Sequence, residues 1–229
     1  DAVDGVLDHS YATGSPDAGF YIGQCYPCDA IVNNVVSEYN GLGYSGTNSG
    51  GSLYITSSIF RNNKGGLAPN TLDSELLPPE RETFIIGNLI ENNNNYNSPA
   101  TNSTYLSYGN GVVIAGGNNN IIKNNVIVDH DLYGVILTAS MDVNYWPAHG
   151  NRVEENLILS SRKADIAVSG VSNLANCFEG NYFNTSIPPG LQALNGCENN
   201  IIPLSADLSG LWSTIARLIY ANTGDFYQD

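Results

Sequence analysis

Short apolar stretches recur along the chain, and each is interrupted by one small amide or hydroxyl residue. These interrupting residues are, in order, Ser10, Asn34, Ser58, Asn88, Asn125, Asn156 and Asn181. They are separated by 24, 24, 30, 37, 31 and 25 residues. A base period near 24 with occasional insertions is typical of a solenoid, in which each repeat forms one coil that stacks on the next.

A second apolar stretch follows in most repeats and begins with a small residue. These stretches cover residues 19–22, 43–46, 66–69, 111–114, 134–137 and 165–168. No helix-length segment lies between the two stretches of a repeat, which excludes βαβ units. A β-sandwich would not keep an amide at a fixed place in the repeat. We therefore predict a right-handed parallel β-helix of about seven coils, with the amides and hydroxyls stacked inward as a ladder along one corner.

The two ends of the chain differ in their pattern. Residues 1–204 carry the repeat, whereas 205–229 form a predicted capping helix and tail. Ser205 can cap the helix, and one apolar stripe follows over residues 205–222, formed by Leu208, Leu211, Trp212, Ile215, Leu218 and Ile219. We expect this helix to plug the C-terminal end of the solenoid, with docking to another protein as the alternative. The first coil has no such cap, which predicts upstream coils or a partner there.

Composition narrows the class of partner. The hydrophobic fraction of 42% excludes a disordered chain, and no apolar run reaches the roughly 18 residues of a membrane span. A formal net charge of −14 with 8 Lys and Arg argues against nucleic acid and makes anionic polysaccharides difficult ligands. The 31 Asn residues indicate many tight turns, because Asn tolerates left-handed backbone.

The four cysteines fall into two local pairs. Cys25 and Cys28 lie in the first coil, and Cys177 and Cys197 lie about five coils later. At about 4.8 Å per coil the pairs are roughly 20 Å or more apart, which excludes a shared zinc site. Two local disulfides fit best and predict an extracytoplasmic location. A redox role or a two-thiolate copper site for the first pair is the weaker alternative.

Three stretches of the sequence resemble a known group of proteins. Residues 19–28, 38–48 and 80–83 are similar to bacterial secreted right-handed parallel β-helix repeat proteins of the pectate-lyase-like superfamily. The resemblance implies the fold and little about activity, since members of this group are mostly named by fold alone. The broader superfamily includes pectate lyases, alginate epimerases and copper-loading accessory proteins.

Three insertions interrupt the period at residues 71–81, 92–109 and 138–149, and all could flank the face of the second strand. They carry several aromatic residues, namely Tyr96, Tyr105, Tyr108, Tyr145 and Trp146. Aromatic loops beside such a face suit stacking on sugar rings, although the same rings could simply pin the loops to the solenoid. The candidate ligand-binding residues are Tyr21, Asn48, Tyr96, Tyr145 and Trp146.

Catalytic groups are scarce where a β-helix lyase would need them. The predicted outward row of the second strand contains no Asp, Glu, Lys, Arg or His; its members are Tyr21, Ser45, Ala68, Val113, Ile136 and Ala167. Asp73, Glu75 and Glu80 lie in an insertion, where a carboxylate pair for glycoside hydrolysis could form, with Asp73 and Glu75 as the catalytic candidates. The stretch 129–131, Asp-His-Asp, is similar to the Asp-Pro-His-Asp motif of alginate epimerases but lacks its proline, and we interpret it as a turn.

Two hypotheses follow. The first is a non-catalytic extracytoplasmic β-helix, an accessory or structural subunit that binds a glycan or a partner protein. The second is a carbohydrate-active enzyme, a lyase, epimerase or hydrolase, with its site in the insertion loops. The uncharged outward row favours the first. No motif calls for a cofactor or a metal. Asn102 and Asn184 each begin a glycosylation triplet, which is a short pattern that also occurs by chance.

Overall fold

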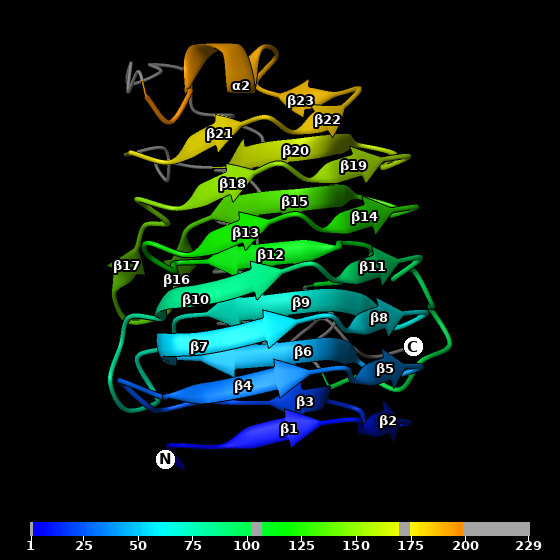
Figure 1. Ribbon diagram of the computed structural model, residues 1–229, viewed down its shortest axis with the longest axis vertical. Coiled ribbons are helices and arrows are strands. Elements are labelled where there is room, and N and C mark those ends of the chain that lie inside the picture. The colour runs from blue at the N-terminus through cyan, green and yellow to red at the C-terminus, as the bar shows by residue number, and fades with distance from the viewer. Residues whose placement is uncertain (1, 102–106, 170–174, 199–229) are drawn as a thin grey trace.

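Three seven-stranded parallel sheets run the length of the part of the molecule that the structure describes (Figure 1). The structure is a computed structural model, and it describes residues 2–101, 107–169 and 175–198. Each coil contributes one strand to each sheet, and within each sheet the strands of successive coils pair with one another. The architecture is thus a parallel β-helix of seven coils, as the repeat predicts.

The three sheets are named A, B and C in the order in which the chain visits them. Sheet A holds β1 (Val6–Asp8), β4 (Ala30–Asn33), β7 (Gly50–Thr56), β10 (Arg81–Ile86), β13 (Ile121–Lys123), β18 (Arg152–Glu154) and β21 (Cys177–Glu179). Sheet B holds β2 (Tyr11–Thr13), β5 (Val36–Glu38), β8 (Ile59–Arg61), β11 (Leu89–Glu91), β14 (Val126–Val128), β19 (Leu157–Leu159) and β22 (Tyr182–Phe183). Sheet C holds β3 (Ala18–Tyr21), β6 (Leu42–Thr47), β9 (Gly65–Asn70), β12 (Val112–Ala115), β15 (Tyr133–Thr138), β20 (Ala164–Ser169) and β23 (Ser186–Ile187).

Each coil contains three strands, one more than the sequence pattern suggested. The first apolar stretch of each repeat is split by a sharp bend into a strand of sheet A and a strand of sheet B. The residue before the ladder position is in the left-handed region, for example Ser57 with φ 49° and Asn124 with φ 56°. This conformation turns the chain within one residue, so two strands fit where the pattern indicated one.

The predicted asparagine ladder is present at the corner between sheets A and B, and it includes Asn88, Asn125, Asn156 and Asn181, all buried. Asn125 illustrates the pattern. Its Oδ1 accepts hydrogen bonds from the backbone N–H and side-chain amide of Asn88, and its Nδ2 donates to the carbonyl of Ile85 and to Oδ1 of Asn156. Each amide thereby satisfies buried backbone groups of the neighbouring coil, which explains why the position repeats.

One early member of the predicted ladder, Asn34, is wrong. Asn34 is exposed and has φ 50°, so it is the left-handed bend residue, and the next residue, Val35, occupies the ladder position. The N–H of Val35 donates to Oγ of Ser58, the hydroxyl that begins the ladder. Ser10 does lie at the ladder position, in register with Val35, but it is exposed in the first coil, and its hydroxyl donates to the carbonyl of Asp8 as that of Ser58 does to Thr56. Asn often occupies both the ladder position and the bend position, so residue type alone did not distinguish the two.

Similar ladders, which the sequence pattern did not reveal, line the other two corners. Asn40, Asn63 and Asn93 are linked in the same way between sheets B and C. Asn120, Asn151 and Asn176 are linked between sheets C and A. The many Asn residues therefore serve all three corners of the solenoid.

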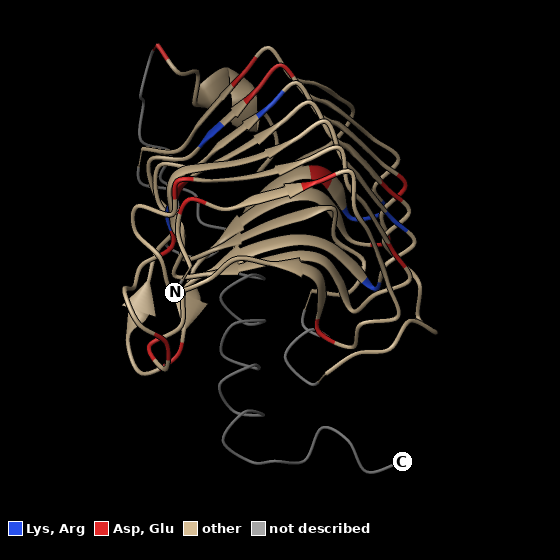
Figure 2. Ribbon diagram, turned by 60° about the horizontal axis from the view of Figure 1, so that its bottom comes forward, with Lys and Arg blue, Asp and Glu red and all other residues tan. Residues whose placement is uncertain are grey.

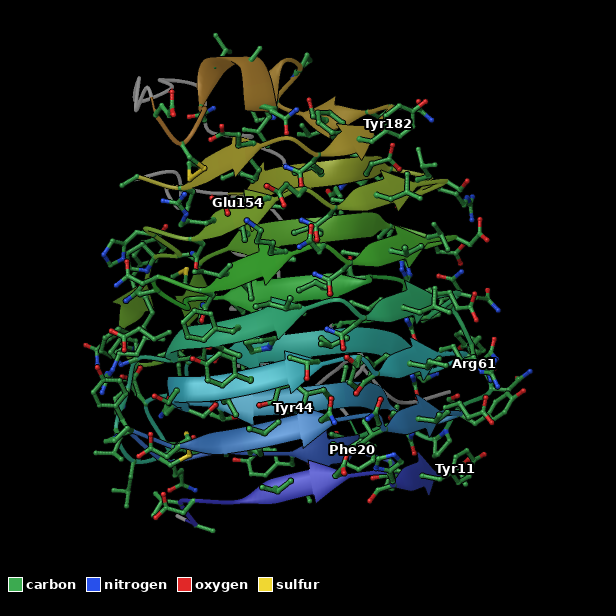
Figure 3. The ribbon with its side chains drawn as sticks, viewed as in Figure 1. Tyr11, Phe20, Tyr44, Arg61, Glu154 and Tyr182 are labelled. Atoms are coloured by element: carbon green, nitrogen blue, oxygen red, sulfur yellow. A yellow bond between two sulfur atoms is a disulfide. The ribbon has the colours of Figure 1, made fainter. Side chains whose placement is uncertain are left out.

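The core is a column of apolar side chains inside the three sheets. Sheet A contributes one row of residues that are all 0% exposed, namely Val32, Ile55, Ile85, Ile122, Val153 and Phe178. Phe20 and Tyr44 of sheet C point into the same column, whereas Tyr11 and Tyr182 project outward from sheet B (Figure 3). Burying one such side chain contributes about 1.5–3 kcal/mol to folding, so the stacked row stabilises the solenoid along its length.

The small residue that begins each sheet C stretch has a steric reason. A Cβ added to Gly111 would lie 2.7 Å from Nε2 of His130, and one added to Gly19 would lie 2.7 Å from Nδ2 of Asn40. The glycines therefore leave room for the ladder at the corner between sheets B and C.

The C-terminal end of the solenoid is closed by α2 (Leu191–Leu194). Leu191 is 0% exposed in the core, and Oε1 of Gln192 accepts hydrogen bonds from the N–H and side-chain amide of Asn181. Gln192 thus ends the ladder. The predicted helix over 205–222 lies outside the described residues. No helix within those residues is long and apolar enough to cross a membrane.

Both predicted disulfides are present. One joins Cys25 to Cys28 and the other joins Cys177 to Cys197. The first lies against the buried side chains of Ala30 and Leu53, and the second fixes the segment after α2 to strand β21.

Candidate functional site

The insertions flank sheet C, as expected from where they leave the coils. Residues 71–80 follow β9, and the β16–β17 hairpin follows β15, so both lie at the corner between sheets C and A. Residues 92–101 and 107–111 precede β12 and lie at the corner between sheets B and C. The hairpin, β16 (Ser140–Met141) paired with β17 (Tyr145–Trp146), stands beside β10 and β13 at the left of Figure 1.

Loop 71–80 and the hairpin form one unit, and Asp73 joins them. Its carboxylate accepts hydrogen bonds from the backbone and side-chain amides of Asn144, each at 2.7 Å, and from Nε1 of Trp146 at 3.1 Å. The N–H of Asp73 donates to a carboxylate oxygen of Asp142 at 2.9 Å. The amide hydrogen bonds of Asn144, first among several, lower the pKa of Asp73.

Two further side chains fix the same loop to the solenoid. Asn48 is 0% exposed, its Nδ2 donates to the carbonyls of Leu72 and Glu75, and its Oδ1 accepts the N–H of Leu72. Asn48 thus shapes the loop, and its predicted contact with a ligand stays a prediction. Gln24 accepts the N–H of Leu76.

Tyr21 faces the loop from the first coil. It is 45% exposed, and its hydroxyl donates to Oε2 of Glu75 at 2.9 Å. Burial, followed by the hydrogen bond to the Glu75 carboxylate, raises the pKa of Tyr21 to about 12. Two carboxylates of loop 71–80 are therefore each hydrogen-bonded by an aromatic side chain from outside the loop. Tyr21 bonds to Glu75, and Trp146 bonds to Asp73.

The other two predicted ligand-binding residues lie apart from this pair. Tyr145, 41% exposed, pairs with Met141, and alternation along β17 places it on the opposite face of the hairpin from Trp146. Tyr96 belongs to the insertion at the other corner of sheet C. It is 66% exposed, and the Lys64 ammonium lies 4.8 Å from the centre of its ring. Its ring meets that of Tyr108 edge-on at 6.2 Å.

The predicted outward row of sheet C is confirmed by the strand register, which aligns Tyr21 with Ser45, then Ala68, and Val113 with Ile136 and Ala167. The row has no carboxylate, imidazole or cationic side chain. Hydroxyl and amide side chains lie next to the first half of the row, where the hydroxyl of Thr47 donates to Oδ1 of Asn70 at 3.1 Å. The row offers no base for proton abstraction from a uronate.

The Asp129–Asp131 stretch forms a turn, and its histidine belongs to the interior. Asp129 has φ 61°, and His130 is 1% exposed at the ladder position after Asn93, with Nε2 3.3 Å from the carbonyl of Ile90. Burial lowers the pKa of His130 to about 4. Asp131 accepts the hydroxyl of Tyr108 at 2.8 Å. These contacts hold the turn and the neighbouring insertion together.

The third carboxyl of the insertion, Glu80, closes loop 71–80, and its burial was not evident from the sequence pattern. Glu80 is 0% exposed, and its two oxygens accept the hydroxyl of Thr83 and the amide of Asn120, each at 2.8 Å. Its N–H donates to Oγ1 of Thr71 at the other end of the loop. Burial raises the pKa of Glu80 to about 8, against the effect of these hydrogen bonds.

Metal-binding groups are sparse in the described part of the chain. The one cluster of three candidate ligand atoms there consists of Glu154, Cys177 and Cys197. Both sulfurs are in a disulfide, and the carboxylate of Glu154 is engaged by Arg152 and lies 3.5 Å from the Lys123 ammonium. This cluster is therefore not a metal site in the oxidised protein.

Comparison of the sequence with known protein families finds no match, and no curated protein matches it either. Among solved structures, the chain is similar to the A-module of a mannuronan C-5 epimerase from Azotobacter vinelandii, with 14% identity and a TM-score of 0.47. The alignment covers 88% of this chain and 56% of that one, so the chain spans little more than half of the module's length. At this level the similarity concerns the β-helix fold and not the activity.

Proposed function

We propose that this protein is a non-catalytic, extracytoplasmic β-helix that binds a neutral glycan on loop 71–80. The observation that carries the proposal is the arrangement of Tyr21 and Trp146, which hydrogen-bond to carboxylates two residues apart on one loop. Aromatic faces next to fixed hydrogen-bonding groups suit a sugar ring, which has an apolar face and a hydroxylated edge. Tyr145 extends the same unit on the far side of the hairpin.

The charge of the chain supports a neutral ligand. The formal net charge is −14, and Asp73 and Glu75 add two carboxylates at the proposed site itself, which disfavours a uronate polymer. The two disulfides support an oxidising compartment and hence an extracytoplasmic location.

The alternatives have less support. A hydrolase would need one carboxyl as general acid, but hydrogen bonds lower the pKa of Asp73, which makes it a poor proton donor. Glu80 on the same loop has a raised pKa and can keep a proton, but it is 0% exposed and its oxygens are bonded to Thr83 and Asn120, so it does not face a substrate. A protein partner bound through Val113 and Ile136 would need those side chains free, and they are 7% and 8% exposed.

The test is binding to soluble neutral glycans, such as β-glucan, mannan and xylan, by isothermal titration calorimetry. We expect Trp146→Ala and Tyr21→Ala to weaken binding roughly two- to twelvefold each, from about 0.5–1.5 kcal/mol per stacked ring. Trp146→Phe keeps a ring but loses the bond to Asp73, so it separates stacking from loop support. Tyr182→Ala is the matched control, because Tyr182 is a 66% exposed tyrosine on sheet B. Equal binding by all four variants, or no binding to any neutral glycan, would reject the proposal.

A further inference from the structure

Loop 71–80, which carries the proposed glycan site, is closed at its base by hydrogen bonds between its first and last residues. The N–H of Glu80 donates to Oγ1 of Thr71 at 3.0 Å, and that hydroxyl donates to the carbonyl of Gly116 in the next coil at 2.8 Å. Oγ of Ser140 donates to the carbonyl of Thr71 at 2.7 Å. The β16–β17 hairpin therefore rests on the same contact between Thr71 and Glu80, which we call the loop junction.

The side chain of Glu80 extends from the loop junction into the interior of the solenoid. It is 0% exposed, and its oxygens accept the hydroxyl of Thr83 and the side-chain amide of Asn120, each at 2.8 Å. Gly117 leaves the space that the carboxyl occupies, because a Cβ added there would collide with Oε2 of Glu80. Both hydrogen-bond donors are neutral, and a carboxylate in such a place costs far more free energy than a protonated carboxyl.

No cationic side chain among the described residues forms an ion pair with Glu80. The guanidinium of Arg81 attracts the carboxylate, but it lies 3.7 Å from the centre of the Tyr26 ring and donates to the carbonyl of Pro79. Loop 71–80 and the β16–β17 hairpin contain acidic residues and no Lys or Arg, and Figure 2 shows red acidic segments beside this hairpin at its lower left. The charge of an ionised Glu80 would therefore be unpaired in the closed loop.

Two further titratable groups lie near the loop junction, and neither places a positive charge against the carboxyl. Tyr44 of β6 is 0% exposed, and burial raises its pKa, so the phenol stays neutral. His149 follows the hairpin, and its Nδ1 lies 2.7 Å from the side-chain amide of Asn118. The N–H of Asn118 donates to the carbonyl of Glu80, so the imidazole is one residue removed from Glu80.

An ionised Glu80 is thus accommodated only if it reaches water, which requires the loop junction to open. We propose that Glu80 is a pH-sensitive closure of loop 71–80: when its carboxyl gives up its proton to solvent, the contact with Thr71 breaks and the loop releases its glycan. The site then binds at acidic and neutral pH and releases at alkaline pH. The identity of the ligand rests on the proposed function, whereas the opening of the loop does not.

The size of the effect follows from proton linkage. Burial raises the pKa of Glu80 to about 8 in the closed loop, from an ordinary value of 4.5 that the hydrated carboxyl regains. The closed loop is therefore favoured most below pH 4.5 and loses this advantage as pH rises towards 8. The ratio of open to closed loop rises by up to about tenfold per pH unit, or about 10³-fold between pH 5 and pH 8.

Hydrogen exchange measured by NMR on the full chain, without glycan, tests the opening. The amides to follow are those of Leu72, which donates to Oδ1 of Asn48, and of Glu80 itself. Their protection factor is the intrinsic exchange rate divided by the measured rate, so the ordinary effect of pH on exchange is removed. We expect it to fall by up to about tenfold per pH unit between pH 5 and pH 8 in wild type and to stay constant in Glu80→Gln.

Glu82→Gln is the matched control, because it removes a carboxylate from β10 at a position of intermediate exposure outside the loop junction, and it should follow wild type. The amides of β13 report unfolding of the whole solenoid and should stay at least about 100-fold better protected than the loop. The closure is refuted if the wild-type loop amides keep a constant protection factor or if Glu80→Gln shows the wild-type slope. It is also refuted if the loop is as well protected as β13, because the loop then opens only with global unfolding.

A second variant keeps the test valid if Glu80→Gln does not fold. Thr71→Val keeps the carboxyl of Glu80 and removes the hydroxyl that its N–H contacts. The variant should lower the protection of the loop amides already at pH 5. Unchanged protection there would contradict the loop junction.

Calorimetric titration with a neutral glycan that wild type binds at pH 6 tests the release. The dissociation constant should rise above pH 8 by up to about tenfold per pH unit in wild type and stay within about twofold in Glu80→Gln. A wild-type dissociation constant that does not change with pH rejects the release. If no neutral glycan binds at any pH, the proposed function fails and the release fails with it, whereas exchange of the loop amides still decides the closure.

Discussion

Replacing Glu80 by Gln should change how the stability of this protein depends on pH. The Glu80 carboxyl is 0% exposed and accepts hydrogen bonds from Thr83 and Asn120. Its pKa is about 8 in the folded protein, against an ordinary value of 4.5. The native state therefore keeps the proton of Glu80 over a range in which the unfolded chain has lost it.

The sign and size follow from proton linkage. Between pH 4.5 and about 8 the native state binds more protons than the unfolded state, so the free energy of unfolding falls as pH rises and levels off above pH 8. At about 1.36 kcal/mol per pKa unit, this interval is worth at most about 5 kcal/mol. The full stabilisation is present below pH 4.5.

Glu80→Gln keeps a neutral group of the same shape and removes the titration. Gln can accept from Asn120 through its oxygen and donate to the Thr83 hydroxyl through its nitrogen. Relative to wild type, the variant should gain several kcal/mol in unfolding free energy between pH 5 and pH 9. Urea denaturation followed by circular dichroism at several pH values measures this difference.

The contributions of other titrating groups to the free energy of unfolding cancel when the variant is compared with wild type at each pH. Glu179→Gln, at an exposed position on β21, is the control and should give a curve parallel to wild type. If the Glu80→Gln curve is also parallel to wild type, the buried proton on Glu80 is not there and the reasoning is refuted.

Three further predictions concern the ladders and the chemistry. Asn125→Leu should lower the free energy of unfolding by about 3 kcal/mol or more, because buried partners at Asn88 and Ile85 lose hydrogen bonds worth roughly 1–3 kcal/mol each; an unchanged denaturation midpoint would contradict the ladder. Burial lowers the pKa of His130 from 6.5 to about 4, so the stabilisation by the neutral imidazole is lost as pH falls through this range. His130→Asn should make the free energy of unfolding less dependent on pH between about 6.5 and 4, and an unchanged pH dependence there would contradict this. Polygalacturonate and alginate, with and without Ca²⁺, should yield neither unsaturated products by absorbance nor epimerised residues by proton NMR; turnover abolished by Asp73→Asn or Glu75→Gln would instead establish an enzyme.

The repeat determined most of the fold from sequence alone. The sheet C strands, the buried amides Asn88 to Asn181, the outward row and both disulfides follow from positions within one coil or between adjacent coils. Stacking converts sequence period into spatial neighbourhood, so a residue near 24 positions away is a contact. The wrong assignment of Asn34 to the ladder shows where the repeat is not sufficient. A bend residue and a ladder residue can both be Asn, and only the backbone conformation distinguishes them.

The fate of the candidate site residues was decided by the tertiary structure. Asp73 and Trp146 are 73 residues apart and belong to separate insertions, which no period relates, and their hydrogen bond exists because both insertions leave the same corner. The burial of Glu80 and the hydrogen bonds of Asn48 to the backbone of Leu72 and Glu75 depend on the conformation of loop 71–80, which the apolar pattern does not determine. The outward row of sheet C shows the same division: the sequence determines that the row carries no charged residue, whereas the low exposure of Val113 and Ile136, 7% and 8%, depends on packing in three dimensions.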